Sequence, residues 1–248
     1  MSGSQEIRSQ IASIQNTQKI TKAMEMVAAS KMKKAQDQMI KARPYANKIS
    51  NVISHLAHAH PEYTSEFFAT REVKKKGYII ISSDRGLCGG LNNNLFKLVV
   101  ETIEEDNKSD IKPAFSLIGS KATSFFQRMG GDVMAQTAQL GDKPQIEQVL
   151  GLIKSTIDSF ISGEIDQVYL VYNKFLNTVS QEPTLQKVLP IQAEDKDDDY
   201  DHYWDYLYEP DAETVLESLF TRYIESLVYR GIVCLLYTSP SPRDVLRS

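Results

Sequence analysis

The sequence predicts an α/β protein in which a long N-terminal helix precedes a domain with a mainly parallel sheet. Three observations support this prediction: an apolar heptad pattern in residues 1–60, alternating strand and helix patterns in residues 76–193, and a further helical pattern from residue 211. Strands that alternate with helices are typical of parallel sheets with right-handed crossovers. We therefore expect one α/β domain with a helical extension at each end.

The composition excludes several classes of protein. The chain has 248 residues, a net charge of −4 and 42% hydrophobic residues, which is typical of a folded, non-fibrous protein. We expect no membrane span, because no stretch has the roughly 18 apolar residues that one needs, and no secretory signal in the polar first residues. A pI of about 5.7 argues against a nucleic-acid binder. Two cysteines are too few for a disulfide framework.

Residues 1–60 are predicted to form one long helix with a coiled-coil seam. Counted from Ile7 in alternating steps of four and three, twelve of fifteen positions up to Leu56 are apolar. Such a helix has too little apolar surface to be stable alone, so it needs a partner helix. The helix predicted after residue 211 is its natural antiparallel partner. The large apolar seam residues are Ile7, Ile11, Ile14, Met32, Met39, Ile49 and Ile53.

The seam becomes polar between Gln18 and Glu25, where Ile20, Met24 and Val27 form a second apolar row. This change indicates either a second partner at this point or a coiled coil whose seam is locally hydrated. The pattern alone favours neither.

Residues 76–193 carry the α/β pattern. Strands are predicted at residues 77–82, 114–118, 133–135, 167–172 and 184–191, and helices at residues 91–105, 120–129 and 144–161. Glycines or prolines separate most of these segments, as expected for turns. The alternation predicts the parallel sheet on which the fold class rests.

A glycine-rich turn at residues 83–90 lies between the first predicted strand and its helix. Such a turn places backbone N–H groups at a helix start, where they can bind phosphate. The turn lacks both the lysine and hydroxyl of G-x-x-x-x-G-K-[ST] and the G-x-G-x-x-G spacing. We therefore interpret Gly86, Gly89 and Gly90 as a structural turn, and Cys88 as a packed side chain rather than a reactive thiol. No catalytic or metal-ligating constellation stands out elsewhere.

Charge is distributed unevenly along the chain. Residues 1–60 hold nine basic and three acidic groups, whereas residues 194–211 hold nine acidic groups and one lysine. Aromatic residues interleave with this acidic segment, which favours a docking surface over a plain solvated loop.

Seven motifs together resemble the gamma subunit of bacterial F-type ATP synthase. They lie at residues 6–32, 43–46, 83–92, 118–121, 173–175, 204–211 and 220–226, and include Ser83-Asp-Arg-Gly-Leu-Cys-Gly-Gly-Leu-Asn92. Their order and separations match the family over residues 1–232, in a form similar to that of Gram-negative bacteria. Ordered motifs over this length are far more specific than any single one.

The resemblance implies a fold and a role. The N- and C-terminal helices would form the coiled-coil shaft inside a hexamer of alpha and beta subunits. A Rossmann-like domain would lie at the foot, beside the epsilon subunit and the membrane c-ring. Proton flow through the c-ring would turn this rotor and change the catalytic sites on the beta subunits. The chain itself would be a non-catalytic subunit without a cofactor or metal, peripheral on the cytoplasmic face of the bacterial inner membrane.

The resemblance also assigns residues to regions of the complex. Lys19, Lys22, Met24 and Met26 match the part of the shaft that faces the hexamer. Tyr206, Tyr208 and Glu209 match the foot near the epsilon subunit and the c-ring. The expected divisions of the chain are a shaft helix (1–60), a linker (61–75), the Rossmann-like domain (76–193), an acidic aromatic loop (194–210), the start of the C-terminal shaft helix (211–233) and an aberrant tail (234–248).

The tail departs from the family pattern. Where the family continues a long helix, residues 234–248 contain two prolines, and the apolar run Ile232–Tyr237 has no helical stripe. The last residues resemble a translated adapter sequence. We therefore expect residues 234–248 to be foreign, most of the C-terminal shaft helix to be missing, and the rotor function of this polypeptide to be impaired.

Two other functions remain open at this point. A nucleotide-binding α/β protein would use the turn Gly86–Gly90, and a free-standing coiled-coil adaptor would dimerise through residues 7–56.

Overall fold

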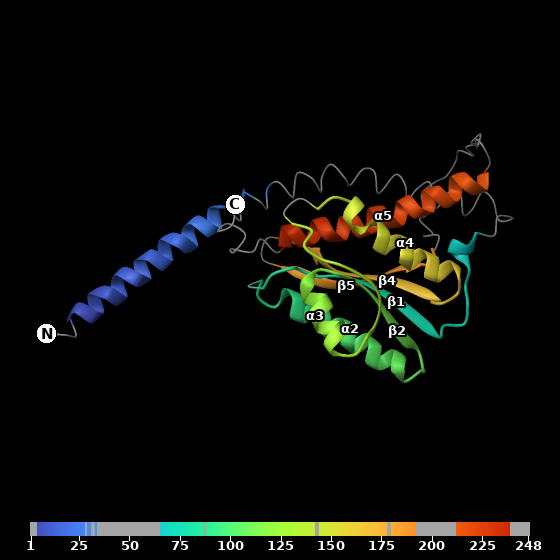
Figure 1. The fold of residues 1–248 in the computed structure, drawn as a ribbon, viewed down its shortest axis with the longest axis horizontal. Coiled ribbons are helices and arrows are strands. Elements are labelled where there is room, and N and C mark those ends of the chain that lie inside the picture. Colours follow the sequence, from blue (N-terminus) through green and yellow to red (C-terminus); the bar gives the residue numbers. More distant parts are fainter. Residues whose placement is uncertain are drawn as a thin grey trace.

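The computed structural model describes residues 4–27, 29–30, 33, 65–86, 88–141, 144–177, 180–191 and 212–238. Residues 4–27 are helical, and an α/β domain begins at residue 65 (Figure 1). In Figure 1 the N-terminal helix, in blue, extends away from this domain. The predicted α/β class is confirmed.

Five strands form one sheet in the order β3-β2-β1-β4-β5. They are β1 (Lys75–Ile81), β2 (Lys112–Ile118), β3 (Asp132–Thr137), β4 (Gln167–Phe175) and β5 (Gln181–Leu189). All neighbours are parallel except β4 and β5, which are antiparallel. The central strand β1 ends in a buried run of isoleucines, as expected for a strand that is covered on both faces. The predicted mainly parallel sheet is therefore confirmed.

Two pairs of helices cover the sheet, one pair on each face (Figure 1). The helices α2 (Leu91–Asn107) and α3 (Ser120–Arg128) pack around a core that includes Phe96, Phe115 and Phe126. The helices α4 (Glu147–Ile161) and α5 (Ala212–Thr238) enclose the larger core on the other face. None of the helices in the described ranges has the length and apolar content needed to cross a membrane.

The helix α5 runs to Thr238 and thus does not end at the expected boundary, residue 233. The residues Ile232, Val233, Cys234 and Leu235 are all buried. Residues 231–235 are buried in succession, which is typical of a buried helix, so an apolar run without a helical stripe is expected for them. The helix therefore continues past residue 233, and the foreign origin expected for residues 234–248 stays a prediction.

The N-terminal helix does not pack against α5 in the described part of the chain. Along residues 4–27 only Met24 and Val27 are half-buried, and every other side chain is exposed. α5 instead packs on the sheet, mainly against β4 and also against β1. The predicted pairing of the two terminal helices is not seen for residues 4–27, and for residues 34–60, which lie outside the described ranges, it stays a prediction.

A polar cluster ties the end of α2 to the sheet. The Asp106 carboxylate accepts hydrogen bonds from Lys76 Nζ and from the Tyr78 hydroxyl, each at 2.5 Å. Burial and the Asp106 carboxylate both raise the pKa of Tyr78, so its hydroxyl stays protonated and donates. The Lys76 ammonium also lies 5.6 Å from the centre of the Tyr169 ring. The cluster fixes α2 against β1 and β4.

Candidate functional site

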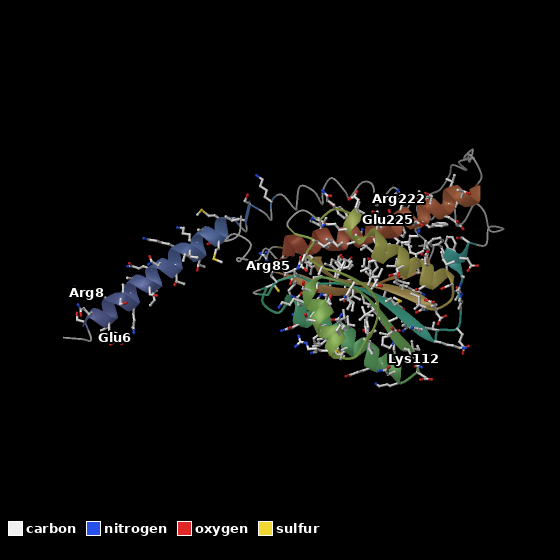
Figure 2. All side chains as sticks on the ribbon, in the orientation of Figure 1. Glu6, Arg8, Arg85, Lys112, Arg222 and Glu225 are labelled. Atoms are coloured by element: carbon white, nitrogen blue, oxygen red, sulfur yellow. The ribbon has the colours of Figure 1, made fainter. Side chains whose placement is uncertain are left out.

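The carboxyl ends of the parallel strands are where α/β proteins usually bind ligands. The glycine-rich turn lies at this edge, between the end of β1 and the start of α2. Figure 2 shows Arg85 of this turn at one end of the domain and Lys112, the first residue of β2, at the opposite end. The candidate site that the sequence predicts is therefore placed at the edge where a phosphate would bind.

The Asn92 side chain occupies the interior of the turn. Its Oδ1 accepts from Ser83 N at 3.2 Å, and its Nδ2 donates to Ser83 Oγ at 2.7 Å and to Cys88 Sγ at 3.2 Å. Ser83 Oγ in turn donates to the Arg85 carbonyl at 2.6 Å. These bonds satisfy Asn92, which is buried, and hold the two arms of the turn together.

The backbone amides in the first turn of α3 also have hydrogen-bond acceptors within the chain. Three consecutive backbone amides of α3 donate to the three residues that follow β1: Ser120 N to Asp84 Oδ1 at 2.9 Å, Lys121 N to Ser83 O at 3.2 Å, and Ala122 N to Ser82 Oγ at 2.8 Å. The Ser120 hydroxyl also donates to Asp84 Oδ1, at 3.0 Å. A carboxylate at a helix N-terminus is stabilised by the helix dipole, just as a phosphate would be. Asp84 thus takes the place that an anion would need.

The predicted turn residues do not all have the same role. Gly89 has φ +59°, which favours glycine. A Cβ at Gly86 would come no closer than 3.8 Å to Lys121 Cε, so nothing crowds that position. At Gly90 a Cβ would lie 3.2 Å from Asn94 Nδ2. Cys88 is half-buried and receives the hydrogen bond from Asn92.

The helix α5 covers the ends of β1 and β4 on the other face of the sheet. Gly231 allows this approach, because a Cβ there would lie 2.6 Å from Ile81 Cδ1 and 3.5 Å from the Tyr172 Cβ. Ile81 is the last residue of β1 and is fully buried. The helix therefore fills the space beside the strand ends on this face.

Gly231→Ala tests this close approach. Alanine in place of a helical glycine normally stabilises by about 1 kcal/mol. At position 231 we expect a loss of about 1–3 kcal/mol instead, because the added methyl group overpacks the contact with Ile81. Urea unfolding followed by circular dichroism measures the change.

Gly151→Ala in α4 is the matched control, because a Cβ there would meet no atom within 4 Å. It should stabilise the domain. Equal stabilisation by both substitutions would show that α5 does not approach the sheet as closely as described.

The predicted shaft residues that the structure describes lie on the N-terminal helix and not at this edge. Ile7, Ile11 and Ile14 are 49–67% exposed on the N-terminal helix. Lys19, Lys22 and Met26 are exposed on the same helix, and Met24 is half-buried. The predicted residues that lie outside the described ranges are Met32, Met39, Ile49, Ile53, Tyr206, Tyr208 and Glu209.

Some residues that shape the site were not singled out from the sequence. Asp84 caps a helix that begins 36 positions later, so no local pattern reveals its role. A serine after a glycine at a helix start, as at Ser120, is the one signal that points to this cap.

The start of α3 at this edge is held by side chains of the chain itself, and the N-terminal helix exposes an apolar row. Comparisons with known proteins define the class. Residues 3–236 match the protein family described as "ATP synthase". The match passes the boundary expected at residue 233.

Relatives from several organisms carry the name ATP synthase gamma chain. The protein from Nitrosococcus oceani is 52% identical over 235 residues, which cover 94% of this chain and 81% of that protein. The protein from Pasteurella multocida is 50% identical over 247 residues, covering 99% and 86% of the two chains. A central-stalk chain of the Tetrahymena thermophila mitochondrial ATP synthase has a TM-score of 0.64 at 23% identity, with 92% and 97% coverage, and so shares the fold.

The chain belongs to the gamma-chain family of ATP synthase. It is thus a non-catalytic stalk subunit, and the rotor function predicted from the motifs is confirmed. The comparisons do not favour a free-standing adaptor or a nucleotide-binding protein.

Proposed function

We propose that this chain is the rotor of a bacterial proton-translocating ATP synthase, with its N-terminal helix inside the hexamer of alpha and beta subunits. Its α/β domain would lie at the foot, beside the epsilon subunit and the c-ring, on the cytoplasmic face of the inner membrane. The observation that carries this proposal is the exposed apolar row on a helix that extends away from the domain (Figure 1). The family membership supports the same assignment.

The described part of the helix has the dimensions of a shaft. Residues 4–27 span about 36 Å at 1.5 Å per residue. Ile7, Ile11 and Ile14 recur at steps of four and three, so they face one side. Burial of each side chain would stabilise an assembly by roughly 1.5–3 kcal/mol. An apolar row of this kind is the expected contact for a partner helix.

The hexamer-facing residues are proposed to be Lys19, Lys22, Met24 and Met26. The two lysines are exposed and three positions apart, which places them on neighbouring turns of one face. Met26 is 63% exposed and can adapt to surfaces of different shape, as a rotating contact requires. At the foot, Tyr206, Tyr208 and Glu209 are proposed to contact the epsilon subunit and the c-ring.

The glycine-rich turn is proposed to be structural in this subunit. At the same edge, the amides of Ser120, Lys121 and Ala122 already have acceptors in residues 82–84, so these three amides at the start of α3 are not available to a nucleotide phosphate. Equilibrium dialysis of the chain against labelled ATP checks this. Saturable binding that Asp84→Ala alters would overturn it.

A substitution in the seam separates assembly from folding. Ile14→Glu places a charge on the exposed apolar row and should lower the yield of complex with alpha and beta subunits at least about tenfold, because that charge would have to be buried. The thermal midpoint of the isolated chain should stay the same, since Ile14 is 67% exposed. Co-purification through a tagged beta subunit measures the yield.

Ser13→Glu is the matched control. It adds the same charge one position away, on the side of the helix that faces away from the seam. Its complex should lose clearly less yield than that of Ile14→Glu, because position 13 lies outside the seam. Equal loss with both substitutions would contradict a specific role for the row.

Co-purification with alpha, beta and epsilon subunits also tests the proposed function as a whole. We expect the chain to be retained with the hexamer and to alter its ATPase rate. A chain that forms homodimers and leaves the hexamer unbound would instead indicate a free-standing adaptor.

A further inference from the structure

We propose that residues 65–74 form a strap that transmits force between the N-terminal helix and the α/β domain. The sequence predicted a linker here, and residues 65–74 are joined to the domain by hydrogen bonds and ring contacts at three separate points. The strap leads directly into β1, the central strand of the sheet. The inference rests on the proposed function for its purpose, whereas the contacts that carry it belong to the isolated chain.

The first fastening point is at Phe67, in the short 3-10 helix Glu66–Phe68. The Phe67 side chain is 3% exposed, and its ring centre lies 5.5 Å from that of Phe220 in α5. The Phe67 carbonyl accepts a hydrogen bond from Ile191 N at 2.8 Å. The adjacent Phe68 ring meets Phe220 edge to face, at 5.1 Å. The start of the strap is thus held by α5 and by the residues just after β5.

The second fastening point is Arg71. Its Nη1 donates to the Phe160 carbonyl in the last turn of α4 at 2.7 Å, and its Nη2 pairs with Glu66 Oε2 at 2.9 Å. The guanidinium also lies 5.3 Å from the centre of the Phe160 ring. A cation at a helix C-terminus is favourable for the helix dipole. One side chain therefore joins the strap to α4 across 89 positions of sequence.

The third fastening point is Asp166, just before β4. One carboxylate oxygen accepts from Lys74 N at 2.7 Å and from Lys75 N at 2.9 Å. The Lys75 carbonyl accepts from Asp166 N at 2.8 Å, so the contact runs in both directions. Hydrogen bonds to a charged acceptor are about twice as strong as neutral ones.

These points lie in series and reach different elements. A pull from the N-terminal side meets α5 at Phe67, then α4 at Arg71, then the start of β4 at Lys74. The force is shared among these elements before it reaches β1. Without the contacts, the same residues would act as a slack tether that extends by roughly 3.3–3.6 Å per residue under load.

Single-molecule force spectroscopy on the full chain tests the strap, with handles at Ser4 and at the exposed Lys97 of α2. In the unmodified chain the strap should stay docked until the domain unfolds. In Arg71→Ala and in Asp166→Ala the strap should undock at lower force than the domain unfolds, in an added step that reaches about 30 Å once Phe67 has also released, because about ten residues are then free. Unfolding midpoints measured in urea report whether the domain itself remains folded.

Arg128→Ala is the matched control. Arg128 also donates to a carbonyl, Ser124 O at 2.7 Å, but this hydrogen bond lies within α3 and does not involve the strap. It should give no added step. The inference is overturned if the unmodified chain shows the early step, or if Arg71→Ala and Asp166→Ala both lack it while the domain is folded. Neither result depends on assembly with other subunits, so failure of the strap and failure of the proposed function are separate outcomes.

Discussion

Replacement of Gly119 by alanine is expected to unfold much of the α/β domain. Gly119 has φ +98°, and a Cβ there would lie 2.0 Å from the backbone oxygen of Ser82. Neither strand end can move away easily, because Ser82 N donates to Ile118 O and Gly119 N donates to Thr137 O, both at 2.8 Å. We expect a loss of roughly 4 kcal/mol or more, which places this among the severe substitutions. Urea unfolding of the isolated chain measures it.

Gly130→Ala isolates the contribution of the clash. Gly130 also has a positive φ, +73°, but a Cβ there would meet no atom within 4 Å. Its cost should be only the roughly 1–2 kcal/mol of the left-handed backbone. Similar losses in the free energy of unfolding at both positions would mean that the contact with Ser82 does not contribute to the loss at Gly119.

The second large effect is expected for Asp106→Ala. The substitution leaves the Lys76 ammonium and the Tyr78 hydroxyl without their acceptor, and the Lys76 side chain is only 15% exposed. Removing one partner of a buried pair costs about 3–5 kcal/mol, because the other charge stays buried. The free energy of unfolding in urea should fall by this amount.

Two further variants test the cause. Adding Lys76→Met to Asp106→Ala should restore part of the lost stability, because it removes the orphaned charge. Glu101→Ala breaks the exposed pair between Lys97 and Glu101 and should cost less than about 1 kcal/mol. If the double variant is no more stable than Asp106→Ala, the loss does not come from the buried lysine.

Local patterns were sufficient to predict most of the domain. The apolar runs of β1 and β4 and the helical spacing of α2 and α4 lie within single segments, so each can be read without its neighbours. The end of α5 could not be predicted, because an apolar run buried on every side has no periodicity. The seam residues were predicted from spacing alone, and their partner remains to be tested.

The contacts of the candidate site depend on long-range placement. The missing nucleotide-binding motifs predicted that the glycine-rich turn is structural. That Asp84 occupies the start of α3 depends on how β1 and β2 lie side by side. Arg71 and Phe160, or Lys74 and Asp166, are joined across about 90 positions, and no spacing rule covers such pairs.

The carboxylate of Asp84 has a consequence for a subunit that works among nucleotides. ATP and ADP are the product and the substrate of the enzyme to which this family belongs, so their concentrations vary with the energy supply of the cell. A stalk domain that bound either one would change its shape and stiffness with that supply. Because the anion at the start of α3 is covalently part of the chain, it never dissociates. A nucleotide phosphate would therefore have to displace this carboxylate to reach the start of α3.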